Sequence, residues 1–236
     1  MDETLQLALP LLQPAQAQKH VTVNEALVRL DGLTHLTLQS VDTVVPPVSG
    51  DDGEAWGVPL GAVNAWDGHA GEVAVWSNGG WVYVQPQTGW RGWLVDQHVA
   101  VLHDGSGWVN GGVAASVNRA VSALNVLEFD HAIAAGASSV TAGVIPQYAM
   151  VFAVTARIKT AFTGALSDWD FGVAGATNRY GSGLGLSAGS WVSGITGQPV
   201  TYYADTPLVL TANGGDFAGG ELRVAVHCFT ASPPEV

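Results

Sequence analysis

Short apolar runs separated by turn residues dominate the second half of the chain. Gly, Pro, Asn and Asp stand between these runs, and such residues end strands and favour tight turns. The strand-like runs are residues 140–144, 150–158, 169–173, 200–203, 208–211 and 222–229. Residues 180–197 are rich in Gly and Ser, and we expect a long loop there. The pattern predicts a β-sandwich of the jelly-roll type over residues 127–236.

Helical spacing of apolar residues is found near the N-terminus. It follows a capping box formed by Thr22 and Glu25, and Gly32 is a stop signal for the predicted helix. Residues 33–39 alternate imperfectly and favour a strand. Because one short helix cannot make a core, we expect residues 1–50 to form an attachment segment. That segment would pack against a neighbouring module or against a second copy of the chain.

Tryptophan is concentrated in one part of the sequence. Seven of the nine Trp residues lie between positions 56 and 108, which marks residues 51–109 as a small Trp-rich β module. Within it, Asn78-Gly79 and Asp104-Gly105 each stand between strand-like stretches and predict β-hairpins. Flat indole faces stack on sugar rings and exclude water from them, so this density favours a carbohydrate-binding protein over an enzyme.

Residues 110–126 are expected to connect the Trp-rich module to the sandwich. Apolar residues recur there at intervals of four, four and three, namely Val113, Val117, Val121 and Leu124. This spacing fits a short helix or a trimer-forming seam. The adjacent glycines and the Val and Asn content make the segment a poor autonomous helix, and we therefore treat it as a connector.

Composition narrows the class of ligand. Charged residues make up 12% of the chain, Lys and Arg together number eight, and the formal net charge is −12. Nucleic acids and anionic lipids need basic residues on the protein, so we expect no nucleic acid partner and no membrane insertion, whereas a neutral glycan is compatible. Cys228 is the single cysteine, which excludes an intrachain disulfide.

The N-terminus carries a weak resemblance to a secretory signal. Leu5 to Leu12 is apolar, and Ala15-Gln16-Ala17 has the small residues of a cleavage site. The start of the chain is acidic, and Pro10 and Pro14 interrupt the apolar run, so we expect no secretory signal. No run approaches the ~20 apolar residues of a membrane span.

Several segments of the sequence resemble an uncharacterised domain family found in alphaproteobacterial prophages and gene transfer agents. They are residues 9–31, 66–76, 89–93, 179–185, 202–208 and 214–220. The resemblance implies a structural appendage of a phage-like particle, a head spike or tail fibre, assembled in the cytoplasm and released extracellularly on the particle surface. It also implies a homo-oligomer, commonly a trimer, that docks to other particle proteins through its N-terminal segment and adheres to capsular polysaccharide. The family supplies no established catalytic residues.

Two groups of residues are candidates for binding carbohydrate. Trp90, Arg91 and Trp93 lie in the segment Gly89-Trp90-Arg91-Gly92-Trp93 and could form a stacking platform with a hydrogen-bonding cation, although both indoles could instead form the core of the module. The second group combines planar polar groups with rings in turn-rich segments, as lectin sites do. It consists of Asp168, Asp170, Arg179, Trp191, Tyr202 and Tyr203. The rings could instead serve packing, and the aspartates could cap turns.

Catalysis and metal binding find less support in the sequence. A carboxylate pair could hydrolyse a glycan, and the nearest pairs are Asp168 with Asp170 and Glu54 with Asp67. Sequence proximity alone does not place them at a catalytic distance, so we expect no enzyme. No His pair has metal-ligand spacing, and we expect neither a metal nor a cofactor. The leading hypothesis is a non-enzymatic adhesin, with a polysaccharide depolymerase or a purely structural connector as the alternatives.

Overall fold

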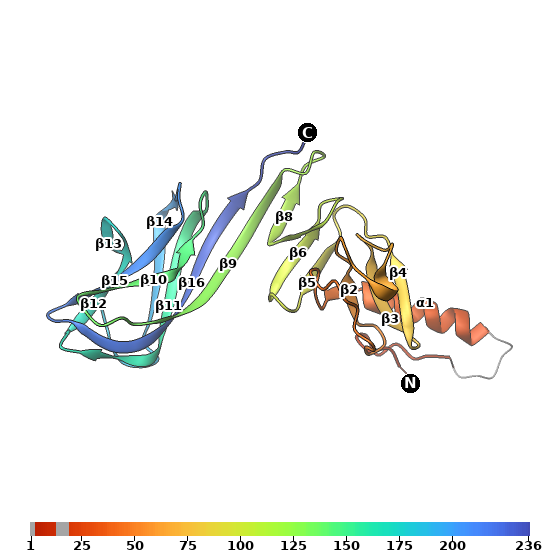
Figure 1. Ribbon diagram of the computed structural model, residues 1–236, viewed down its shortest axis with the longest axis horizontal. Helices are drawn as coiled ribbons and strands as arrows, with labels where there is room; N and C mark the ends of the chain where they lie inside the picture. The colour runs from red at the N-terminus through yellow and green to blue at the C-terminus, as the bar shows by residue number, and fades with distance from the viewer. Residues whose placement is uncertain (1–2, 13–18) are drawn as a thin grey trace. The chain divides into compact units, whose positions relative to one another are not determined.

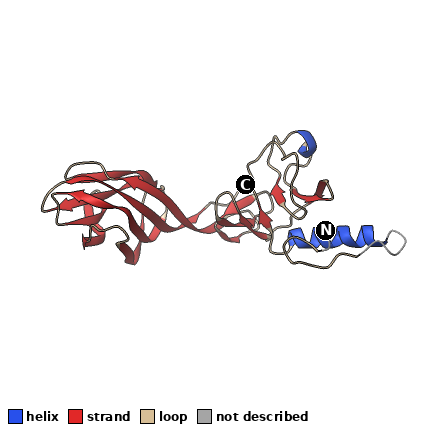
Figure 2. Cartoon of the chain, turned by 90° about the horizontal axis from the view of Figure 1, so that it is seen from below, coloured by secondary structure: helices blue, strands red, loops and turns tan. Residues whose placement is uncertain are grey.

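The computed structural model describes residues 3–12 and 19–236, and these residues form a mainly β protein (Figures 1 and 2). The mainly β class expected from the sequence is confirmed. The chain divides into two compact units, residues 1–121 with 233–236 and residues 122–232. Residues 15–17, considered above as a cleavage site, lie outside the described residues. None of the helices described is long and apolar enough to cross a membrane.

The predicted N-terminal helix is present as α1 (Lys19–Leu33), and it is longer than the sequence indicated. Gly32 lies inside the last turn of α1 and not beyond its end. A Cβ atom on Gly32 would lie 2.9 Å from the Val75 side chain and 3.2 Å from the Gly53 carbonyl oxygen. The glycine therefore allows the helix to approach the sheet closely. The sequence predicted only that Gly32 ends the helix, and it did not predict this close packing.

The first unit contains a seven-stranded mixed sheet in the order β4-β3-β2-β1-β5-β6-β7. Its strands are β1 (Thr37–Leu38), β2 (Ala55–Gly57), β3 (Val73–Ser77), β4 (Gly80–Val84), β5 (Arg91–Leu94), β6 (Val99–His103) and β7 (Trp108–Asn110). Strand β1 runs parallel to both β2 and β5. The N-terminal segment thus packs against its neighbouring module, one of the two arrangements expected for it, by giving the sheet its central strand.

Both predicted hairpins of the Trp-rich segment are confirmed. Asn78 and Gly79 join β3 to β4 with φ angles of 50° and 80°, the left-handed conformation that a two-residue hairpin turn requires. Asp104 and Gly105 lie in the turn between β6 and β7. The Asp104 carboxylate accepts hydrogen bonds from the backbone N–H groups of Ser106 and Gly107, which closes this turn.

Most of the tryptophan in this unit forms a core. Trp66 is fully buried, and Trp56 and Trp76 are 8% and 9% exposed. The Trp81 ring meets the other three edge-on, with ring centroids 4.8–5.3 Å apart, the geometry that aromatic pairs prefer. Between β2 and β3, the short 3-10 helix η1 (Asn64–Trp66) carries one of these rings inward. The Trp density therefore reflects packing of a small module more than a binding surface.

The segment expected as a connector is extended and not helical. Strand β8 (Gly112–Ala115) is followed by a turn, and β9 (Val121–Ala132) begins directly after it. The Ser116 side chain accepts a hydrogen bond from the Ala120 backbone N–H across this turn. Val117 is fully exposed at the turn, so the apolar spacing noted in the sequence does not produce a buried helical face.

The second unit has two antiparallel sheets in the orders β10-β15-β12-β13 and β14-β11-β16-β9. Besides β9, its strands are β10 (Ser138–Ile145), β11 (Met150–Gly164), β12 (Asp168–Val173), β13 (Ala176–Leu184), β14 (Trp191–Thr201), β15 (Thr206–Asn213) and β16 (Phe217–Ala231). Pairing is nested along the chain: β9 pairs with β16, β10 with β15, β11 with β14 and β12 with β13. This is the jelly-roll winding expected from the sequence.

One expectation for this unit is wrong. Residues 180–197 form no long loop, because β13 and β14 take up most of them. Glycine lets these strands approach each other: a Cβ on Gly194 would lie only 2.5 Å from the Tyr180 carbonyl oxygen. The core between the sheets contains fully buried side chains from both, among them Phe171, Leu210 and Leu222.

Candidate functional site

The outward face of the sheet β14-β11-β16-β9 carries a dense group of polar side chains. Strand alternation buries Ala156 and Val224 in the core and turns their neighbours outward. Strand register then brings outward residues into rows across the sheet. One row contains Trp191, Arg157, Arg223 and Asp130, and the next contains Ser193, Thr155, Ala225 and Glu128.

Apart from Asp130, the residues of these two rows line a shallow groove of about 360 Å³. Trp191 stands at one side of it with 66% of its surface exposed. Most of this ring is therefore open to solvent beside the polar groups of the groove. Thr155 and Ser193 add hydroxyl groups to the groove, and the Thr155 hydroxyl lies 3.1 Å from Nε2 of His227.

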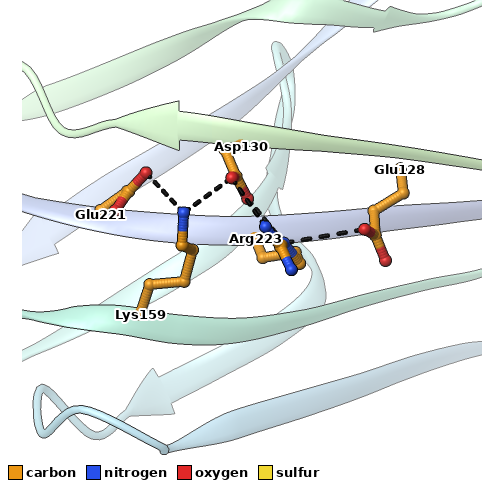
Figure 3. A network of polar contacts seen from close by, with 5 residues as sticks. All are labelled: Glu128, Asp130, Lys159, Glu221 and Arg223. Carbon is orange, nitrogen blue, oxygen red and sulfur yellow. Dashed lines mark hydrogen bonds and ion pairs between the residues drawn. The ribbon is translucent and has the colours of Figure 1, made fainter.

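An ion-pair network borders the groove on the β9 side (Figure 3). The Arg223 guanidinium donates two hydrogen bonds to the Asp130 carboxylate, at 2.8 and 2.9 Å, and lies 3.7 Å from Glu128. Lys159 bridges Asp130 and Glu221, with its Nζ 2.7 and 2.8 Å from their carboxylate oxygens. Bidentate and shared contacts of this kind fix side chains that would otherwise sample many rotamers.

The network shifts the protonation equilibria of its members. Hydrogen bonds from Arg223 and Lys159 hold the pKa of the Asp130 carboxyl well below its usual value. Hydrogen bonds to Asp130 and Glu221 raise the pKa of Lys159, and the hydrogen bonds to Asp130 raise the pKa of Arg223. At neutral pH these three groups are therefore charged, and Glu221 and Glu128 supply the further negative charge around the two cations.

Arg157 differs from the other cations on this face. Its Nη1 donates a 3.0 Å hydrogen bond to the Gly189 carbonyl oxygen. Within the part of the chain that the structure describes, no carboxylate lies at ion-pair distance from Arg157. In strand register, Arg157 lies between Trp191 on one neighbouring strand and Arg223 on the other.

Of the residues expected to bind carbohydrate in this unit, Trp191 alone lines the groove. Asp168 and Asp170 lie at the start of β12 in the other sheet, where the Asn213 amide donates to both carboxylates at 2.7 and 3.1 Å. Burial acts to raise the pKa of Asp170, but hydrogen bonds from Ser182, Gly183 and Asn213 outweigh it and leave that pKa below its ordinary value. The pair thus has a local structural role, joining β12 to β15.

The remaining candidates of this unit, Arg179, Tyr202 and Tyr203, lie outside the groove. Arg179 is exposed on β13. The Tyr202 hydroxyl is 2.7 Å from the Tyr180 hydroxyl, and the Tyr202 ring packs against the core. Tyr203 is 75% exposed and meets the ring of Tyr148 edge-on. The structure therefore does not gather these residues and Trp191 into one lectin-like site.

The candidate platform of the first unit is divided between core and surface. Trp90 packs against the core of the sheet, in agreement with the interpretation that this indole belongs to the core of the module. Trp93 is 45% exposed and shares a shallow hollow of about 260 Å³ with Arg91, His35 and neighbouring backbone. The Arg91 guanidinium donates to the Val113 carbonyl oxygen at 2.7 Å. Trp93 and Arg91 therefore remain available for binding here, whereas the sequence predicted a platform with two indole faces.

A larger hollow of about 360 Å³ in the first unit has a different lining. Asp42, Glu72, His103 and Trp108 contribute side chains to it. Burial lowers the pKa of His103, so this side chain is neutral at pH 7. Both carboxylates already accept hydrogen bonds from within the unit, from Gln97 and His69. With no Arg or Lys and a half-buried indole, this hollow offers less for recognition than the groove.

Sequence reasoning missed Arg157, Arg223 and Thr155 as groove residues. Arg157 and Lys159, and later Arg223 and His227, alternate with apolar residues in the sequence, and that pattern identifies strands with one wet face. It does not reveal that the two strands are neighbours. Among residues 3–12 and 19–236, no three His, Cys, Asp or Glu side chains converge to hold a metal ion.

The fold and the groove define the class of protein: a mainly β chain of two units, the second a jelly roll with an open sheet face lined by an exposed aromatic ring. Residues 23–109, all in the first unit, match the family described as "Protein of unknown function (DUF2793)". A solved structure described as the cyanophage Pam1 capsid asymmetric unit contains a chain that is 24% identical over 46% of this chain and 86% of that one. Its TM-score of 0.34 assigns no shared fold. A comparison with curated proteins finds no match.

Proposed function

We propose that this chain is a structural appendage of a phage-like particle, a head spike or tail fibre, that adheres to polysaccharide on the host cell surface. The jelly-roll groove is the binding site in this proposal. The observation that carries it is the exposed Trp191 ring, placed directly opposite Arg157 in a groove that also offers hydroxyl groups.

The chemistry of the groove suits a sugar ring. The apolar face of a pyranose stacks on an indole, and its hydroxyl groups bond to planar and charged side chains around it. Arg157 and Glu128 provide a donor and an acceptor within the same groove. The groove is shallow and open, which suits an internal segment of a long polymer more than an enclosed small molecule.

The particle role rests on sequence resemblance and on analogy of fold. The resemblance to prophage and gene transfer agent proteins extends from residue 9 to residue 220. Jelly rolls are common in viral capsid proteins and in lectins, although fold alone does not determine function. In this proposal the N-terminal segment docks to other particle proteins, and the chain assembles as a homo-oligomer, with a trimer as the expected form. Several copies would bind a repetitive polysaccharide with avidity.

The proposed appendage binds and does not cleave. The sequence offered Asp168 with Asp170 as a hydrolytic pair, and both carboxylates are engaged by Asn213 at the start of β12. They are also in the sheet opposite the groove. A depolymerase would need two carboxyl groups flanking the bound glycosidic bond.

A matched pair of tryptophan variants tests the proposal. Surface polysaccharide from the bacterium that encodes the chain is immobilised, and binding of the intact protein is measured by biolayer interferometry. We expect Trp191→Ala to weaken binding about tenfold, which corresponds to about 1.4 kcal/mol, a typical loss for an aromatic contact. Trp93→Ala, an exposed indole of the first unit, serves as the control and should bind like wild type. Equal binding by Trp191→Ala and wild type would show that the groove is not the site.

A further inference from the structure

We infer that the groove selects acidic sugars: a pyranose ring stacks on Trp191 and its carboxylate pairs with Arg157. This inference rests on the proposed function and specifies its ligand. It departs from the expectation of a neutral glycan, which was drawn from the charge of the whole chain.

The first step is the order of side chains across the sheet. Arg157 is the register partner of Trp191 on β14 and of Arg223 on β16. Neighbouring strands lie about 4.8 Å apart, which is close to the width of a pyranose ring. A sugar stacked on Trp191 therefore places a substituent at its ring edge directly over Arg157.

The second step is the difference in charge balance between the cations of this face. Arg223 and Lys159 are already paired with Asp130 and Glu221. Arg157 gives one N–H group to a backbone carbonyl, and among the described residues it has no carboxylate partner. A guanidinium has five N–H donors in a planar fork that matches a carboxylate, so Arg157 keeps a free bidentate edge.

The third step is the position of the nearby acids, which would repel an anionic ligand. Glu128 and Asp130 lie on β9, two strands away from Arg157 on β11, so their backbones are about 10 Å from that of Arg157. That distance is comparable to the screening length of about 8 Å at physiological ionic strength. Both carboxylates also face Arg223, which offsets their charge locally.

The fourth step concerns the net charge of −12. Three of the eight Lys and Arg residues lie on this one sheet face, namely Arg157, Lys159 and Arg223. Glu128, Asp130 and Glu221 on the same face balance these three cations, so the net charge of the whole chain does not describe the groove. Charge that is spread over the remaining surface is largely screened from the ligand at physiological salt.

The experiment compares acidic polymers with their own neutral forms. Polygalacturonate, alginate and hyaluronan are each immobilised beside a carboxyl-reduced sample of the same polymer, and intact protein is passed over them. We expect at least one acidic polymer to bind at least tenfold more tightly than its reduced form. Arg157→Gln should remove this preference, so that the acidic and the reduced form of the polymer bind equally, and Arg157→Lys should keep part of it because the charge remains without the fork.

Arg179→Gln is the control, because Arg179 is exposed on β13 in the other sheet, and it should behave as wild type. Unchanged melting temperature of each variant confirms that the fold is intact. Equal binding to acidic and reduced polymers, with Trp191→Ala still weakening binding, would overturn the acidic preference and leave the proposed function standing. Absence of binding to every polymer and to the host polysaccharide would overturn both.

Discussion

His131 shows how a single buried side chain makes the second unit sensitive to pH. It is 9% exposed, and its Nε2 lies 2.8 Å from the Ser139 hydroxyl, which also accepts the Ala134 backbone N–H. Burial disfavours the charged imidazole and lowers its pKa. The unfolded chain, with a His pKa of about 6.5, then binds the proton more readily than the folded chain does. Stability from this group is present above pH ~6.5 and is lost as pH falls.

We expect the free energy of unfolding of wild type to decrease between pH 7 and pH 5, and His131→Gln to show a flatter dependence. Urea denaturation at a series of pH values measures both proteins. His103 also has a pKa lowered by burial, but it contributes equally to both proteins and cancels in the difference. Parallel pH profiles for the two proteins would show that His131 is not the group responsible.

Tryptophan illustrates what residue type alone does and does not predict. The sequence marked Trp191 as a candidate, but it gave greater weight to the indoles between residues 56 and 108. In the structure Trp66 is fully buried and Trp191 is 66% exposed. Both are flanked by turn-rich sequence, and the difference comes from which face of a strand or turn meets another layer. That is a tertiary property, so residue density predicted the presence of aromatic clusters and not their exposure.

At the scale of elements, two glycines on β14 form a matched pair. A Cβ on Gly194 would lie 2.5 Å from the Tyr180 carbonyl oxygen and 2.6 Å from the Tyr180 Cβ, so β13 or β14 would have to shift. A Cβ on Gly197 would meet nothing within 4 Å. We expect Gly194→Ala to destabilise the unit by roughly 1–3 kcal/mol, the usual cost of overpacking. Gly197→Ala should change stability by less than about 0.5 kcal/mol.

Thermal and urea denaturation of the two variants measure this difference directly. A Gly194→Ala protein as stable as Gly197→Ala would mean that β13 and β14 do not approach as closely as described. The comparison is informative because both substitutions add the same methyl group to the same strand.

The sequence predicted most elements, and its errors have physical causes. Five of the six strand-like runs coincide with the long strands β10, β11, β12, β15 and β16. Residues 180–197 were expected to form a loop because Gly and Ser usually favour turns. Here Gly181 and Gly194 instead permit close packing at the edge between the sheets. Gly32 was likewise expected to end the helix, and it instead permits close packing of the last turn of α1 against the sheet.

At the scale of the whole molecule, the second unit has the properties of an independent domain. Its core is formed by side chains from its own two sheets, and its strands pair with one another in a closed nested order. We expect a fragment of residues 122–232 to unfold in one cooperative transition and to bind monovalent oligosaccharide with the affinity of the intact chain. Calorimetry of the fragment and of the whole chain checks this. An aggregated or unfolded fragment would show that the first unit is needed for its stability.

The jelly-roll class could be predicted from strand number and turn spacing, whereas the groove could not. Its lining comes from β9, β11, β14 and β16, and their order follows from long-range pairing that the sequence does not encode locally. A register shift of one residue would turn Arg157 into the core. Of the candidate residues chosen from sequence in this unit, Trp191 lines the groove and the others lie elsewhere.

The central claim, that a sugar stacks on Trp191, is tested most directly by fluorine NMR. The chain is labelled with 5-fluorotryptophan, the Trp191 resonance is assigned by its loss in Trp191→Phe, and the spectrum is recorded during titration with an acidic oligosaccharide. The account predicts that the Trp191 resonance shifts in a saturable manner, while those of the buried Trp66 and Trp169 stay in place. Saturable shifts at Trp93 with none at Trp191, or no shift at any tryptophan, would contradict it.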